Sequence, residues 1–168
     1  VLRRVSEYLA NGGTYGRGAY ARCHDATRIV ETTRQQLALL LGIKRPQQLL
    51  FTASATASLN TVLFGLNYPN RRVAISPLEH HAVTRPLHEL KKRLNLQVDV
   101  LPALPTGMLH YESLPKNWGE AYDLVIINHA SNVNGVIQPL EQIRATMGNA
   151  LLLVDASQSA GIVSIDVE

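Results

Sequence analysis

The sequence predicts an α/β protein of three layers (α/β/α), in which helices cover both faces of a mostly parallel sheet. Short apolar runs alternate with segments whose apolar residues recur at helical spacing, as in repeated strand–helix–strand units. Two of the runs, residues 124–127 and 151–154, are continuously apolar, which is typical of strands covered on both faces. With 168 residues, 46% of them hydrophobic, the chain suffices for one such core.

The first expected helix follows an N-terminal segment of residues 1–24. It spans residues 25–41 and is followed by Gly42, which stands where a C-cap glycine belongs. The later expected helices are residues 59–64, residues 82–94 with Pro86 in or near the first turn, and residues 140–147. The expected strands are residues 49–52, 72–76, 97–101, 124–127 and 151–154, with an irregular or briefly helical stretch at 109–118.

Charge and cysteine content exclude several classes of protein. The formal net charge is +3 and the basic residues are scattered, apart from Lys91, Lys92 and Arg93 on a predicted helix surface, so no nucleic-acid partner is expected. A single cysteine, Cys23, allows no internal disulfide and fits a reducing compartment, which predicts a cytoplasmic location. No apolar run approaches the roughly 20 residues that span a bilayer, so no membrane partner is expected.

Polar residues follow four of the expected strands at the point where each strand ends. Ligands of open α/β sheets bind outside the carboxyl ends of the strands, so these residues are candidates for one common site. The four segments are Ser54-Ala55-Thr56-Ala57-Ser58, Glu79-His80-His81, His129-Ala130-Ser131-Asn132 and Asp155-Ala156-Ser157-Gln158.

Residues 54–58 open a predicted helix and suit a phosphate. Free N–H groups and the helix dipole attract an anion there, and the hydroxyls of Ser54, Thr56 and Ser58 are further donors. An ordinary helix cap rich in serine and threonine explains the same residues equally well.

Asp155 and the two histidines each allow a functional and an ordinary interpretation. A carboxylate that closes an apolar strand needs a partner, for which a protonated ring nitrogen is suitable, although a helix N-cap aspartate is the alternative. One of His80 and His81 is suited to lie flat against an aromatic ligand, while each alone is more often an ordinary loop histidine. No further histidine or cysteine ligand accompanies the pair at a suitable spacing, so no metal site is expected.

The glycine-rich stretch Gly12-Gly13-Thr14-Tyr15-Gly16-Arg17-Gly18 does not follow a predicted strand. The dinucleotide-binding fingerprint requires that position, because its glycines join a strand to a helix at the pyrophosphate. A nucleotide-dependent oxidoreductase is therefore the least favoured interpretation.

Taken together, four segments resemble the class V aminotransferases, which depend on pyridoxal 5′-phosphate (PLP), and most of all their cysteine desulfurase and selenocysteine lyase branch. The segments are Thr52-Ala-Ser-Ala-Thr-Ala-Ser-Leu-Asn60, Ser76-Pro-Leu-Glu-His-His-Ala-Val83, His129-Ala-Ser-Asn-Val-Asn-Gly135 and Val154-Asp-Ala-Ser-Gln-Ser-Ala-Gly161. The resemblance implies the front portion of a PLP-transferase large domain, a homo-oligomer, and a small amino-acid substrate such as cysteine or selenocysteine.

The resemblance also assigns a role to each candidate residue. It implies that Ala55 and Thr56 hold the cofactor phosphate and that His80 stacks on the pyridine ring. The remaining roles lie around the ring: Asn132 and Gln158 would bind near the phenolic oxygen, and Asp155 would pair with the protonated ring nitrogen.

Several positions and segments depart from the family pattern. Ser54 replaces a usual glycine, so a positive φ there would be costlier, and Ala57 replaces a usual glutamate. The family's Schiff-base lysine lies after the Asp155 motif, whereas the lysines of this sequence, Lys44, Lys91, Lys92 and Lys116, all precede it. The family's nucleophilic cysteine and its small domain also have no counterpart in residues 1–168, since Cys23 does not match. We therefore expect these residues to be inactive alone, or to be a non-catalytic binding domain that retains the fold.

Overall fold

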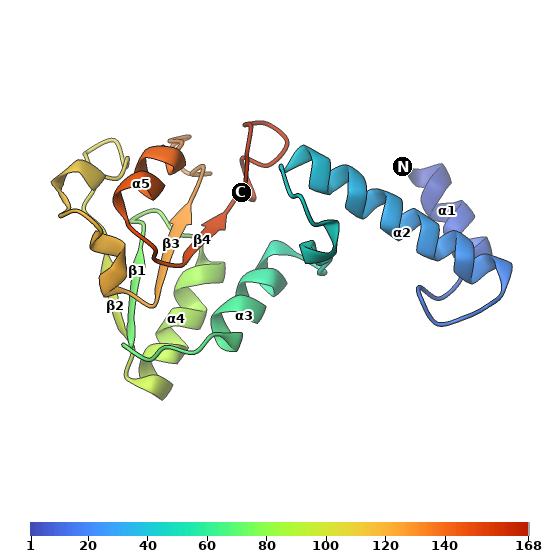
Figure 1. Cartoon of the computed structure of the whole chain (residues 1–168), viewed down its shortest axis with the longest axis horizontal. Helices are drawn as coiled ribbons and strands as arrows, with labels where there is room; N and C mark the ends of the chain where they lie inside the picture. Colours follow the sequence, from blue (N-terminus) through green and yellow to red (C-terminus); the bar gives the residue numbers. More distant parts are fainter. Residues whose placement is uncertain (168) are drawn as a thin grey trace. The chain divides into compact units, whose positions relative to one another are not determined.

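The computed structural model describes residues 1–167 and divides into two compact units, which are considered separately below. We call Thr52–Ile162 the α/β unit, and Val1–Phe51 with the end of the chain from Val163 the N-terminal unit. Figure 1 labels the elements of both units.

The N-terminal unit consists of helices. Helix α1, Leu2–Asn11, lies in the segment where no element was expected, and α2, Ala21–Leu40, begins four residues before the predicted start at residue 25. The C-cap prediction is confirmed, because Gly42 has φ +69° and Ile43 N–H donates to the Ala38 carbonyl at 2.8 Å. The glycine-rich stretch joins α1 to α2 and therefore follows no strand.

The prediction of a strand at residues 49–52 is wrong. A short 3-10 helix, Pro46–Gln48, closes there with a bond from Leu49 N–H to the Pro46 carbonyl, and the next residues have no neighbouring strand to pair with. Leu50 is 79% exposed, and the Arg34 guanidinium lies 5.4 Å from the centre of the Phe51 ring. The apolar run therefore lies at the surface of the N-terminal unit rather than in a sheet.

The α/β unit contains a four-stranded sheet in the order β2-β1-β3-β4, and all its pairings are parallel. The strands are Arg72–Ile75 (β1), Gln97–Val100 (β2), Leu124–Asn128 (β3) and Leu152–Asp155 (β4). All four lie where the sequence predicts a strand. Every residue of β3 is buried, which agrees with its continuously apolar sequence.

Helices cover both faces of this sheet, so the three-layer prediction is confirmed (Figure 1). Helices α3, Ala55–Gly65, and α4, His81–Leu94, contribute Leu63, Val83 and Leu87 to an apolar cluster on one face. Helix α5, Leu140–Thr146, and the 3-10 helices Tyr111–Ser113 and Trp118–Ala121 cover the other face. Side chains of β3 alternate between the two clusters, as the period of a strand requires.

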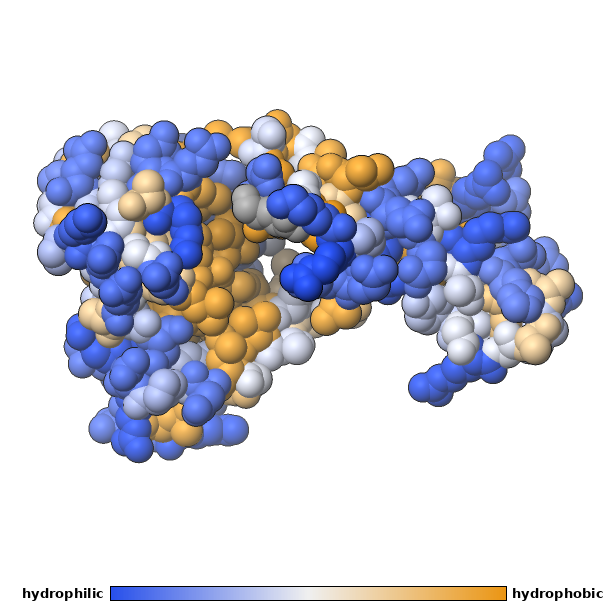
Figure 2. Space-filling model, in the orientation of Figure 1, coloured by the Kyte–Doolittle hydropathy of each residue, from blue (hydrophilic) through white to orange (hydrophobic). Residues whose placement is uncertain are grey.

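Strand β4 lies at one end of the sheet and is less covered than β3. Three of its four residues are only partly buried, and Leu151 just before it is 52% exposed. Figure 2 shows apolar surface on the part of the α/β unit where Figure 1 draws β4 and α3. A strand edge of this kind carries unpaired backbone groups that are able to pair with a further strand. Across residues 1–167, none of the helices combines the length and the apolar character needed to cross a membrane.

Candidate cofactor-binding site

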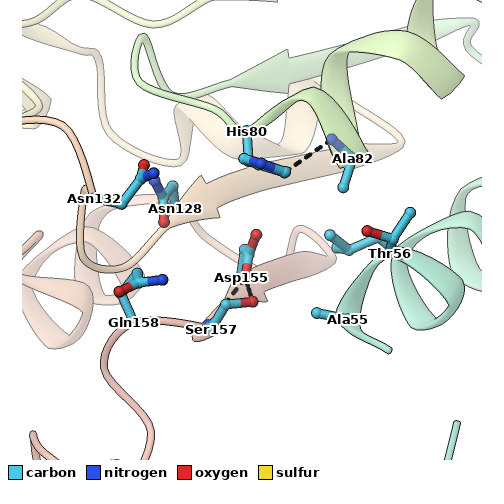
Figure 3. A pocket seen from close by; sticks show the side chains of 10 residues that line it. Ala55, Thr56, His80, Ala82, Asn128, Asn132, Asp155, Ser157 and Gln158 are labelled. Atoms are coloured by element: carbon cyan, nitrogen blue, oxygen red, sulfur yellow. Dashed lines mark hydrogen bonds between the residues drawn. The ribbon is translucent and has the colours of Figure 1, made fainter. Parts of the chain in front are cut away.

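The carboxyl ends of β1, β3 and β4 lead to a cavity of about 170 Å³ within the α/β unit (Figure 3). The structure brings all six residues that the sequence singled out to this one cavity, although they lie up to 103 positions apart, between 55 and 158. They are Ala55, Thr56, His80, Asn132, Asp155 and Gln158, and the remaining lining residues are Leu59, Ala82, Asn128 and Ser157. The convergence of His80, Asn132, Asp155 and Gln158 follows from the parallel sheet, whose carboxyl ends share one edge. Ala55 and Thr56 follow no strand and reach the cavity at the start of α3.

The N-terminus of α3 forms one wall. Ser54 is its N-cap, and the Ser54 Oγ accepts a hydrogen bond from Ala57 N–H at 3.1 Å. Helix geometry leaves the N–H groups of Ala55 and Thr56 without a partner in the helix, and both residues line the cavity. Ser54 has φ −167°, an extended conformation open to any residue, so the expected cost of replacing glycine does not arise at this position.

Of the three hydroxyls proposed for a phosphate, Thr56 is the one that lines the cavity. The Ser54 hydroxyl serves as the cap. The Ser58 Oγ lies 2.6 Å from the Thr52 Oγ1, which donates its own proton to the Ser54 carbonyl at 3.0 Å. Ser58 is therefore the donor in its bond with Thr52, and its proton is not available to a ligand.

His80 caps α4 on a second wall of the cavity. Its Nδ1 accepts a hydrogen bond from Ala82 N–H at 3.1 Å, so a neutral His80 ring carries its proton on Nε2. This bond fixes the ring at the start of α4. The ring of His81 is inclined by 54° to that of His80, and His81 does not line this cavity.

Asp155 ends β4 and lies at the centre of the view in Figure 3. The residue is 7% exposed. Its Oδ1 accepts bonds from Ser157 N–H at 3.0 Å and from the Ser157 hydroxyl at 2.5 Å. This is an aspartate turn, and no helix follows it within residues 156–167, so the helix N-cap alternative is wrong. Both bonds of this turn are made by Oδ1, so Oδ2 is left to accept a hydrogen bond from a donor in the cavity.

Asn128 is a lining residue that the sequence analysis did not select. It ends β3 directly beside Asp155, its register partner on β4, and its Nδ2 donates to the Leu78 carbonyl at 2.9 Å. The position of Asn128 directly after the apolar residues 124–127 would have allowed its selection as a candidate site residue from the sequence. Asn132 lies four residues later, in a turn closed by a bond from Gly135 N–H to the Ser131 carbonyl.

Two titratable groups lie next to the cavity residues, the half-buried Glu79 and the buried His129. Burial raises the pKa of Glu79, although hydrogen bonds from Ser76 and Asn128 oppose that rise. Burial lowers the pKa of His129, whose Nδ1 has no hydrogen-bond partner among the described residues. Both residues lie in segments that carry the family resemblance, from which no role for either was predicted.

None of the residues that line the cavity is a lysine. Lys91 and Lys92 lie in the last turn of α4, whereas the first turn of that helix faces the cavity. Lys116 precedes Asn117, whose N–H bonds to Thr146 at the end of α5, so it lies at the opposite edge of the sheet. Cys23 is buried in the N-terminal unit. Among residues 1–167, no three His, Cys, Asp or Glu side chains gather as a metal site.

Comparison with known proteins identifies the family. The model of the family "Aminotransferase class-V" matches residues 1–168. A cysteine desulfurase of Escherichia coli O9:H4 (strain HS) is 32% identical over 175 residues, which cover all of this chain and 43% of the relative. The chain thus spans less than half the length of that curated relative.

Solved structures agree with this match. The apo structure of a cysteine desulfurase from Thermococcus onnurineus NA1 superposes with a TM-score of 0.88 at 26% identity, over 99% of this chain and 42% of that one. DndA from Streptomyces lividans gives a TM-score of 0.75 at 32% identity, over 97% of this chain and 46% of that one. PLP is the cofactor of the cysteine desulfurases in this family. With its whole length matched by the family model, this chain belongs to the class-V aminotransferases.

Proposed function

We propose that the cavity of the α/β unit is a PLP site, and that the protein acts on a small amino acid, with cysteine or selenocysteine as the substrate class. The observation that carries this proposal is the position of Asp155. A buried carboxylate with one oxygen left over from its turn lies in the same cavity as the N-termini of two helices. Helix N-termini attract an anion and a carboxylate attracts a cation, so the site suits a ligand that has both a phosphate and a protonated ring nitrogen.

The lining residues fit the two ends of PLP. Ala55 and Thr56 would hold the phosphate through two helix N–H groups and one hydroxyl, which face the cavity. Asp155 would hold the ring nitrogen and keep it protonated, because a cation beside a buried carboxylate is stabilised. His80, fixed by its bond to Ala82 N–H, would lie against the ring, while Asn132 and Gln158 would bind its phenolic oxygen.

When bound, PLP supplies an electron sink for bonds at the α-carbon of an amino acid. The described residues bind and orient it, and none of them is a lysine at the cavity that would attach it covalently. We therefore propose that residues 1–168 alone hold PLP non-covalently and do not turn over substrate. Cysteine as the substrate rests on the cysteine desulfurases that match the chain. A homo-oligomer and a cytoplasmic location also belong to this proposal.

Equilibrium dialysis of PLP against the purified protein tests the site. Asp155→Asn keeps the shape of the side chain but removes its charge, and we expect it to weaken binding about tenfold or more, since bonds to charged groups are worth about 1.5–3 kcal/mol. Glu141→Gln, an exposed residue in the first turn of α5, is the matched control and should bind as wild type does. Equal affinity in wild type and Asp155→Asn would contradict the assignment.

Borohydride reduction of the PLP-treated protein separates non-covalent from covalent binding. For residues 1–168 we expect no stoichiometric lysine adduct by mass spectrometry, because no lysine lines the cavity. A stoichiometric adduct on Lys44, Lys91, Lys92 or Lys116 would overturn that part of the proposal. A folded protein without affinity for PLP would instead favour a non-catalytic binding domain.

A further inference from the structure

Glu79 joins the loop after β1 to the end of β3. Its Oε1 accepts two hydrogen bonds, from the Ser76 hydroxyl at 2.5 Å and from Asn128 N–H at 2.7 Å. A third bond, from the Asn128 Nδ2 to the Leu78 carbonyl, ties the residue just before Glu79 to the same strand. Because His80 is the next residue, Glu79 sets where the chain enters the His80 cap of α4.

The other carboxyl oxygen of Glu79 is buried without a partner. Oε2 is inaccessible to solvent, and no group among the described residues forms a hydrogen bond with it. A charged oxygen left unpaired in the interior is costlier than a neutral hydroxyl left unpaired. With two donors on Oε1 and no partner on Oε2, a proton on Oε2 leaves a neutral hydroxyl unpaired in place of a charged oxygen, and so favours the carboxylic acid.

The charges around Glu79 favour the same protonation state. Asp155 on β4 raises the pKa of Glu79 further, because two neighbouring carboxylates resist ionising together. Titratable groups among the described residues near this edge of the sheet include His80 and His81, which follow Glu79 in the sequence, and His129, which follows Asn128. Burial lowers the pKa of His129, which disfavours a compensating cation at that position.

We propose that Glu79 is a positioning residue which works in its protonated form, holding the loop that carries His80 on β3 and leaving Asp155 as the carboxylate charge of the cavity. A neutral Glu79 can accept the bonds from Ser76 and Asn128 without repelling Asp155. The part of this inference that concerns PLP rests on the proposed function, whereas the protonation state of Glu79 belongs to the protein without ligand.

Glu79→Gln tests the protonation state, because glutamine keeps the shape and the Oε1 acceptor but does not titrate. Glu79 has a raised pKa when folded, so its contribution to stability is present below the ordinary value of 4.5 and is lost as the pH rises through the raised value. In urea unfolding of the PLP-free protein, the folding equilibrium constant of wild type should therefore fall relative to Glu79→Gln over that range, by about tenfold per pH unit at most. Glu141→Gln should follow wild type.

PLP affinity tests the positioning role. We expect Glu79→Gln to bind PLP as wild type does, and Glu79→Ala to bind about tenfold more weakly, because the N–H of Asn128 loses its acceptor at 2.7 Å and keeps only the longer bond to the Ser76 Oγ at 3.3 Å. Ser76→Ala removes one donor to Glu79 and the weaker acceptor of Asn128 N–H, but it leaves the bond between Asn128 N–H and Glu79. It therefore provides a milder variant if Glu79→Ala does not fold, with a severalfold loss expected.

Each outcome bears on one claim. Parallel pH profiles for wild type and Glu79→Gln would overturn the protonated form. Wild-type PLP affinity in both Glu79→Ala and Ser76→Ala would overturn the positioning role. If wild type binds no PLP, the proposed function fails, and the pH profiles of the PLP-free protein still decide whether Glu79 carries a proton.

Discussion

The two compact units of the chain differ in how they bury apolar residues. In the α/β unit, two clusters on opposite faces of the sheet contain fully buried side chains such as Leu63 and Val125. In the N-terminal unit, α1 has no buried residue and the 20-residue α2 buries only Cys23, Ala26 and Ala38. Hydrophobic burial is therefore the main source of stability in the first unit and a small one in the second.

The N-terminal unit is held by close backbone contacts and a small polar cluster. Gly13 packs against the first turn of α2, and the Tyr15 hydroxyl donates to Glu31 at 2.5 Å. Arg34 also bonds to Glu31, and this bond is the main cause of the lowered pKa of Glu31. A groove of about 890 Å³ runs between α1 and α2, lined in part by apolar side chains. Because the two units differ in how much apolar surface they bury, the same kind of substitution should change the free energy of unfolding by unequal amounts in them.

Leu63→Ala should produce the largest effect. Leu63 is fully buried between α3 and the sheet, and truncation of such a leucine costs about 2–5 kcal/mol of unfolding free energy. Leu9→Ala in α1, where the side chain is 79% exposed, should change that free energy by less than about 0.5 kcal/mol. Urea unfolding followed by circular dichroism measures both. Similar losses in the two variants would contradict the contrast between the units.

Gly13→Ala should have an intermediate effect confined to the N-terminal unit. A Cβ at Gly13 would lie 2.3 Å from the Arg22 carbonyl oxygen and 2.7 Å from the Cys23 nitrogen, so the loop has to move, at a cost of about 1–3 kcal/mol. Cys23 is 1% exposed and is the one cysteine of the sequence. Its rate of labelling by a thiol reagent therefore reports opening of this unit.

The expected result is labelling about tenfold or more faster than in wild type, since about 1.4 kcal/mol of lost local stability raises the opened fraction tenfold. Gly65→Ala is the matched control, because nothing lies within 4 Å of a Cβ there and its φ is not positive. It should leave the labelling rate of Cys23 unchanged. Unchanged labelling in Gly13→Ala would mean that the close contact does not hold the unit together.

The α/β unit could be predicted from its sequence because its signals are local. Apolar runs such as residues 124–127 predicted β3 directly. The segments that follow the expected strands, together with the family resemblance, predicted the six lining residues, Asp155 and His80 among them. Residues 49–52 are also mostly apolar but form no strand, since a strand exists only where a neighbour offers hydrogen bonds. Pairing depends on the whole sheet and is not visible in a four-residue pattern.

Helix α1 and the environment of Glu79 were not predicted, for different reasons. Leu2, Val5 and Leu9 recur at helical spacing and indicate helix α1, but no helix was predicted in this segment. The burial of Glu79 had no local signal. Its environment is created by Ser76 and Asn128, which lie 52 positions apart and meet because β1 and β3 are neighbours in the sheet. A residue whose role depends on such a meeting is found only from the structure.

Tyr68→Phe should give the smallest effect and sharpens the account of the α/β unit. Tyr68 is 6% exposed, and its hydroxyl donates at 2.7 Å to the Leu63 carbonyl in the last turn of α3, where no helical N–H remains to bond it. Loss of this bond should cost about 1 kcal/mol of unfolding free energy near neutral pH. At high pH, Tyr68→Phe should also remove a source of instability that wild type has.

Burial, and then the charge of Asp123, raises the pKa of Tyr68 to about 12. The fold thus favours the neutral phenol, whose contribution to stability is complete below the ordinary value of 10.0 and is lost as the pH rises through about 12. Alkaline absorbance titration should therefore show a late tyrosine component that Tyr68→Phe removes and Tyr20→Phe, at a residue 56% exposed in the N-terminal unit, retains. Because phenylalanine does not ionise, the stability deficit of Tyr68→Phe should shrink as wild type loses stability at high pH. A deficit that stays constant up to pH 12 would show that the hydroxyl of Tyr68 ionises as readily in the folded protein as in the unfolded chain.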